Sequence, residues 1–157
     1  MTRLLQCSLF LLLLITLAGC DLFWNSGDSD PTSARLGEPF WIDYGETAAL
    51  DDGALRITFD GTLNDSRCPK NVDCIWEGEA QIQLRLVQGT GQRDSLSLAI
   101  PGLVSVPYTE HVFVAKASYQ FKLLQLDPYP SADDAGGKLS TSEASRYRAL
   151  LLVEKRL

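Results

Sequence analysis

The sequence contains a single histidine, His111, and only four cysteines among its 157 residues. A structural or catalytic metal centre usually takes about three or four His, Cys or carboxylate ligands, and a Ser-His-Asp site needs an imidazole base. No G-x-S-x-G nucleophile motif accompanies His111. Because so few side chains can serve as metal ligands or as a catalytic base, the sequence argues against a metal centre and against nucleophilic hydrolysis. We also expect no cofactor.

Basic residues are also scarce, because 14 Lys and Arg stand against 20 Asp and Glu, which gives a net charge of −6. Proteins that bind nucleic acid or anionic lipid surfaces through charge carry clusters of Lys and Arg. We therefore expect no nucleic-acid partner and no electrostatic attachment to membranes.

What the chain does have is an export signal at its beginning. Arg3 gives a positive start, and residues 9–18 form an apolar run that is short for a membrane span. The sequence Leu17-Ala18-Gly19-Cys20 resembles the bacterial lipobox, in which cleavage before the cysteine leaves that residue N-terminal and acylated. We predict a lipoprotein signal peptide over residues 1–19 and membrane attachment through a lipid on Cys20. An ordinary signal peptide with an incidental cysteine is the alternative.

Residues 20–37 have the composition of a flexible, lipid-anchored linker, rich in Ser, Gly, Asp and Thr. Within it, Leu22-Phe23-Trp24 suit the headgroup level of a membrane, although an exposed linker aromatic fits equally well. Asp21 resembles the inner-membrane retention signal of some Gram-negative lipoproteins and weakly favours the inner membrane. The expected location is the bacterial cell envelope, facing the periplasm or the exterior.

Residues 38–157 read as one domain of short strands. Alternating apolar segments are separated by turn signals at 51–53, 60–61, 89–91 and 101–102. Seven or eight short strands with this spacing predict an all-β fold, a single antiparallel β-sandwich or barrel-like domain. The expected strands centre on residues 40–42, 55–59, 82–86, 96–100, 112–114, 119–123 and 149–153.

Two segments complicate the pattern. Residues 119–126 and 147–153 are apolar on both alternating faces, which indicates either a bulge that switches the inward face or strands covered on both sides. Residues 131–145 form a long polar stretch, which is either a functional loop or a disordered one.

The segment 64–80 is the most distinctive part of the chain. Cys68 and Cys74 bracket five turn-forming residues at the start of a strand pattern. In an exported protein such a pair favours a disulfide over a metal or redox pair. The closed ring would stabilise the fold by about 2.4 kcal/mol on the chain-entropy model.

Several side chains around this ring are candidates for recognition. Asp65 and Arg67 are expected to pair across the turn, and Trp76 to pack on the disulfide and help to close the core. Lys70 at the crown of the ring suggests a protease-inhibitor-like module as an alternative. Glu77 and Glu79 suggest a glycosidase pair, although a solvated acidic face is the commoner arrangement.

Residues 65–80 follow the pattern D-S-R-C-P-x-x-V-x-C-x-W-x-G-x-A, in which x marks a position of any residue. This pattern resembles a motif of small bacterial lipoproteins and secreted proteins of unassigned function. A weaker similarity extends to residues 55–59, 119–121 and 127–130. The resemblance implies an envelope protein but carries no catalytic or binding assignment. We therefore expect a non-enzymatic binding or structural module with an envelope protein as a candidate partner, and an envelope hydrolase remains an alternative.

Overall fold

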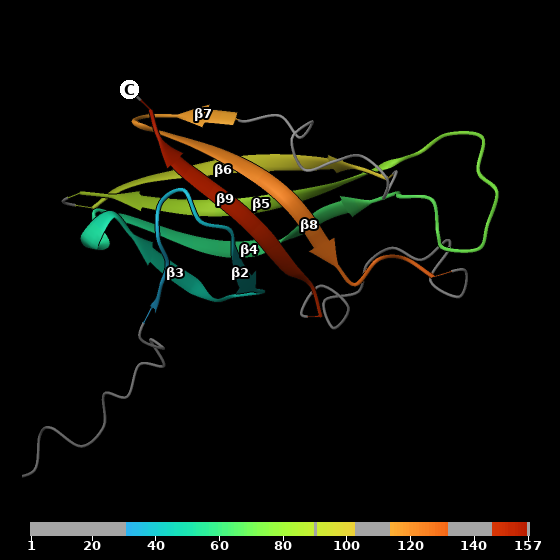
Figure 1. Cartoon of the computed structure of the whole chain (residues 1–157), viewed down its shortest axis with the longest axis horizontal. Coiled ribbons are helices and arrows are strands. Elements are labelled where there is room, and N and C mark those ends of the chain that lie inside the picture. Colours follow the sequence, from blue (N-terminus) through green and yellow to red (C-terminus); the bar gives the residue numbers. More distant parts are fainter. Residues whose placement is uncertain (1–30, 90, 103–113, 132–145, 157) are drawn as a thin grey trace, which may run out of the picture.

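The computed structural model describes residues 31–89, 91–102, 114–131 and 146–156, and the described residues form two packed β-sheets (Figure 1). The first sheet has the order β1-β3-β4-β5-β6 and the second the order β2-β9-β8-β7. All strand pairs are antiparallel except β1 with β3. The elements are β1 (Thr32–Ser33), β2 (Phe40–Asp43), β3 (Thr47–Leu50), the 3-10 turn η1 (Asp51–Gly53), β4 (Leu55–Asp65), β5 (Glu79–Gln88), β6 (Gln92–Pro101), β7 (Val114–Lys116), β8 (Tyr119–Asp127) and β9 (Arg148–Lys155).

The predicted all-β fold is confirmed, and of the two architectures the sandwich is the one observed, since the sheets do not close into a barrel. The strands form where apolar residues alternate, because the alternate side chains of a strand point to the same face. On β5 the buried set is Ala80, Ile82, Leu84 and Leu86. These side chains pack in one core with residues of the opposite sheet that include Phe121, Leu151 and Val153. Among the described residues, no helix is long and apolar enough to cross a membrane.

A bulge explains the double apolar pattern of β8. Its register on β9 shifts between Leu123 and Gln125, so that Leu124 is an extra residue. The inward face then passes from Leu123 to Leu126, and both of these side chains are buried in the core. Of the two predicted explanations, β8 therefore follows the bulge.

The Asp60-Gly61 turn predicted from the sequence is wrong. β4 runs through both residues to Asp65, with a shift of register on β5 between Phe59 and Gly61. Gly61 has a φ of 141°, which suits glycine at a bulge. The Asp60 carboxylate accepts a hydrogen bond of 3.0 Å from Nε of Arg85 on the neighbouring strand. The Asp-Gly pair thus bends the strand and does not reverse it.

The last residues of the predicted linker belong to the domain. Thr32 and Ser33 pair with Ala48 and Ala49 of β3. Leu36 follows them and packs against the core. The folded domain therefore begins before residue 38, because a few apolar side chains in a polar segment are enough to dock it on a sheet edge. Cys20 and Asp21 lie outside the described residues.

Candidate functional site

The segment between β4 and β5 is a long hairpin loop that projects beyond the end of both sheets (Figure 1). The predicted disulfide is confirmed, with the Sγ atoms of Cys68 and Cys74 2.14 Å apart. Between the two strands and the disulfide, the backbone pairing of β4 with β5 continues beyond their ends. The N–H of Ser66 donates to the carbonyl of Glu79, and the N–H of Cys68 donates to that of Glu77. The disulfide therefore closes a loop whose base is a continuation of the sheet.

Two glycines allow backbone segments to approach closely at the base of the loop. A Cβ atom on Gly78 would lie 1.8 Å from the carbonyl oxygen of Ser66, and one on Gly102 would lie 1.9 Å from that of Glu77. The N–H of Gly102 donates to the carbonyl of Gly78 over 3.0 Å. Since no real Cβ fits at such distances, only glycine permits this contact between the loop and the end of β6.

Asp65 and Arg67 form an ion pair at this base, as predicted, but the pair is buried, with 2% of each side chain exposed. Nε and Nη2 of Arg67 donate to the two carboxylate oxygens of Asp65 over 2.8 and 2.7 Å. The same guanidinium donates to the carbonyl oxygens of Leu126 and Pro128. Arg67 therefore joins β4 to the end of β8 in the other sheet. Its burial makes the proposed recognition role of Asp65 and Arg67 wrong, because a partner cannot reach either side chain.

Two tyrosines enclose this pair. The hydroxyl of Tyr147 donates to Oδ2 of Asp65 over 3.0 Å, and the Arg67 guanidinium carbon lies 4.6 Å from the centroid of the Tyr129 ring. The Tyr129 hydroxyl donates to the carbonyl of Gly102. Burial, helped by the negative charge of Asp65, raises the pKa of Tyr147 to about 12. Burial also raises the pKa of Tyr129. Both phenols therefore stay protonated and donate hydrogen bonds at neutral pH.

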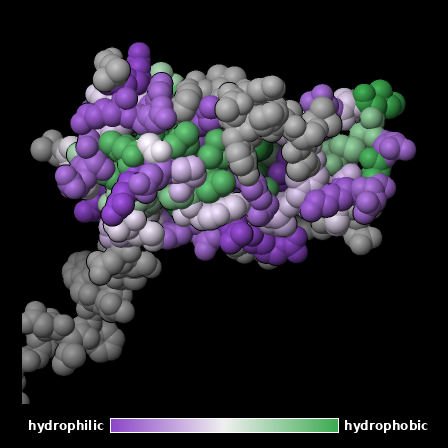
Figure 2. All heavy atoms as spheres, in the orientation of Figure 1, coloured by the Kyte–Doolittle hydropathy of each residue, from purple (hydrophilic) through white to green (hydrophobic). Residues whose placement is uncertain are grey.

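Trp76 is exposed and does not help to close the core, so that prediction is wrong. Its exposed fraction is 71%, and that of the neighbouring Ile75 is 95%. The loop extends past the ends of the sheets, so the sheets do not cover these two side chains (Figure 1). Figure 2 shows the hydrophobic residues of the loop at this end of the molecule, beside hydrophilic ones. The nearest charged side chains along the loop, Asp73 and Glu77, are exposed and acidic.

Ile75 was missed as a candidate residue. A sequence signal for it exists, because Ile75 and Trp76 are adjacent and an alternating strand cannot bury two adjacent side chains on the same face. Glu77 and Glu79, considered as a glycosidase pair, are both exposed. Within the described ranges no group of three His, Cys, Asp or Glu side chains is placed to hold a metal ion. His111 and most of the polar stretch 131–145 lie outside the described residues.

Lys70 lies at the edge of the ring and faces the second sheet. Its backbone N–H donates to the carbonyl of Pro130 over 3.1 Å, and its Nζ lies 5.6 Å from the centroid of the Tyr129 ring. The disulfide ring is thus attached through Lys70 to the segment after β8, whereas Ile75 and Trp76 are exposed to solvent.

Comparison with protein-family models, curated proteins and solved structures found no match to this chain.

Proposed function

We propose that the protein is a lipid-anchored binding module of the bacterial cell envelope, and that residues 71–77, here called the loop tip, bind a protein partner. The exposure of Ile75 and Trp76 on a closed loop is the observation that carries this proposal. Fully burying one large apolar side chain is worth about 1.5–3 kcal/mol, and the free protein gains little of this from Ile75 and Trp76. A partner that covers both side chains would gain it.

The construction of the loop supports a binding role. The disulfide and the hydrogen bonds at the base restrict the loop before any partner arrives, so that less conformational entropy is lost on binding. Tryptophan is among the residues most enriched at the energetic centres of protein interfaces. Ile75 and Trp76 would form that centre, with polar and charged residues around them.

The charges of the loop tip indicate the chemistry of the partner. Asp73 and Glu77 flank the apolar pair, and both are exposed. An apolar groove with Lys or Arg at its rim complements this arrangement, whereas an anionic lipid surface repels it. The described chain also begins toward the opposite end of the sandwich (Figure 1). A tether that leaves from that end directs the loop tip away from the anchoring membrane.

The two alternative functions receive less support. A protease inhibitor would present Lys70 on a convex tip, but this residue is directed at Tyr129. A hydrolase of the glycosidase type would need one of its two carboxyl groups to be sheltered so that it holds a proton. Glu77 and Glu79 are both solvated.

Crosslinking and recovery of the protein from native envelopes tests the role of the loop tip. We expect wild type to capture a specific protein and the variants Ile75→Ser and Trp76→Ser to lose it while their melting temperatures stay unchanged. Leu63→Ser is the matched control, because Leu63 is an exposed apolar residue of β4, with an exposed fraction of 55%, outside the loop. Equal capture by all four proteins would refute the proposal.

A further inference from the structure

A second surface, distinct from the loop tip, lies where the ends of β8 and β9 meet the disulfide ring. Lys70, Asp127, Pro128, Tyr129, Arg146 and Arg148 line an open cleft there, with a volume of about 660 Å³. This volume lies within the range of small-molecule sites. Three of these six residues are cationic, on a chain whose net charge is −6.

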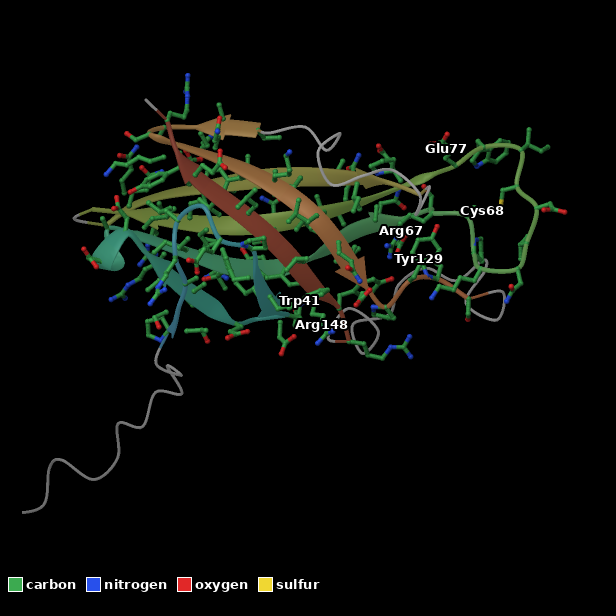
Figure 3. All side chains as sticks on the ribbon, viewed as in Figure 1. Trp41, Arg67, Cys68, Glu77, Tyr129 and Arg148 are labelled. Atoms are coloured by element: carbon green, nitrogen blue, oxygen red, sulfur yellow. A yellow bond between two sulfur atoms is a disulfide. The ribbon has the colours of Figure 1, made fainter. Side chains whose placement is uncertain are left out.

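The alternation of side chains at the start of β9 brings two of the cations together. Tyr147 points inward to Asp65, so that Arg146 and Arg148 on either side of it are exposed. The guanidinium of Arg148 is held over the Trp41 ring, with its central carbon 4.2 Å from the ring centroid (Figure 3). Arg148 is thus oriented by an aromatic contact before any ligand binds.

The third cation comes from the disulfide ring. This cation is Lys70. The backbone hydrogen bond from Lys70 to Pro130 and the contact of its ammonium group with Tyr129 place it at the cleft. The Tyr129 ring is itself fixed by Arg67 and by the hydrogen bond to Gly102. A buried ion pair thus positions the wall of the cleft without entering it.

One carboxylate, Asp127, shares the cleft. Its Oδ1 accepts a hydrogen bond of 3.0 Å from Gln125, and its Oδ2 lies 3.7 Å from Nη2 of Arg148. Neither Lys70 nor Arg146 forms an ion pair with a carboxylate of the described residues. The lining therefore has two positive charges in excess.

We propose that this cleft binds the dianionic phosphoryl group of a phosphate monoester, either a small soluble ester or the headgroup of phosphatidic acid, with Lys70, Arg146 and Arg148 contacting its oxygens. The excess of two positive charges matches a phosphate monoester, which carries a charge of about −1.5 to −2 at neutral pH. Arginine provides forked N–H donors for phosphate oxygens, and lysine adds a point charge. This inference is independent of the proposed role of the loop tip.

Titration of the purified protein with glycerol phosphate, followed by calorimetry, tests the site. We expect saturable binding that is weakened at least tenfold by Arg146→Gln and by Lys70→Gln, and acetate should bind more weakly than glycerol phosphate. Arg93→Gln is the matched control, since Arg93 is an exposed arginine of β6 outside the cleft. The control should bind as wild type does.

Vesicles distinguish the two sources of the phosphoryl group. Binding to phosphatidic acid vesicles that is lost in Arg146→Gln, together with no response to glycerol phosphate, assigns the cleft to a lipid headgroup. Binding of glycerol phosphate without vesicle binding assigns it to a soluble ester. Equal behaviour of wild type, Arg146→Gln and Lys70→Gln toward both probes overturns the proposal.

Discussion

Arg67 is a fully charged side chain inside the protein, and its partners come from both sheets. Asp65 lies two residues away, whereas the carbonyls of Leu126 and Pro128 belong to a distant part of the chain. Removing one member of a buried ion pair typically costs about 3–5 kcal/mol, because the other charge stays buried without its partner. A loss of binding in an Arg67 variant would therefore report damage to the base of the loop. The variants of Ile75 and Arg146 test binding more directly.

The sequence allowed the Asp65–Arg67 pair to be predicted, since the two residues face each other across one turn. Their burial was not predictable, because it depends on Tyr147 and on the end of β8, which only tertiary folding brings near. Trp76 was misjudged for a related reason. Whether an aromatic residue beside a disulfide is covered depends on how far the loop extends beyond the sheets.

The hydroxyl of Tyr147 makes the stability of the protein sensitive to alkaline pH. Its pKa is about 12 in the folded protein against an ordinary value of 10.0. Folding thus favours the neutral phenol, and this contribution is fully present below pH 10 and is lost as the pH rises toward 12. Urea unfolding of wild type and Tyr147→Phe measures it.

Below pH 10 the difference in unfolding free energy between these two proteins should be constant. Between pH 10 and 12 wild type should lose on the order of 2 kcal/mol relative to the variant. Tyr119, whose pKa burial also raises to about 12, titrates in both proteins and cancels from the comparison. A difference that does not change with pH would show that Tyr147 is not held in its neutral form by folding.

At the scale of elements, the strands were predictable and their irregularities were not. Four alternate residues of β5 are buried, and the expected strand, centred on residues 82–86, lies within the observed one, Glu79–Gln88. The bulge in β8 was one of two explanations of its pattern, and the register on β9 was needed to decide between them. Asp60-Gly61 fits a turn and a bulge equally well, because both use the same backbone freedom of glycine.

The hairpin loop between β4 and β5 should keep its base without the disulfide. The ring closed by Cys68 and Cys74 spans seven residues, for which the chain-entropy model gives about 2.4 kcal/mol. The double variant Cys68→Ser/Cys74→Ser should lose about this much unfolding free energy in urea, while its circular dichroism spectrum stays that of wild type. Thiol alkylation of unreduced, unfolded wild type should label neither cysteine. Unchanged stability of the double variant would show that the hydrogen bonds at the base restrict the loop by themselves.

On the scale of the whole molecule, the all-β fold and the single domain followed from the spacing of apolar segments and turns. The choice between a sandwich of two sheets and a barrel did not, because it depends on which strands pair. The start of the domain was placed too late, because the pairing of Thr32–Ser33 with β3 has no signal in a polar segment. The resemblance to bacterial lipoproteins and the anchor on Cys20 stay predictions.

Mass spectrometry of the protein purified from membranes tests the anchor. We expect the N-terminal residue to be Cys20, with a mass increased by a diacylglyceryl group and, depending on the bacterium, a further acyl chain. Cys20→Ser should abolish this modification and release the protein from the membrane fraction. An unmodified N-terminus at any other residue would contradict lipid attachment.

The exposure of the loop tip determines how far its amino-acid sequence can vary. Residues 71–77 are all exposed, whereas the hydrogen bonds, the two close glycine contacts and the buried ion pair lie below them at the base. Apart from Cys74, which closes the disulfide, folding therefore places few demands on the identity of the tip residues. The other tip residues can be replaced while the scaffold stays the same, and foreign peptides inserted between Cys74 and Glu77 should be displayed without loss of the sandwich.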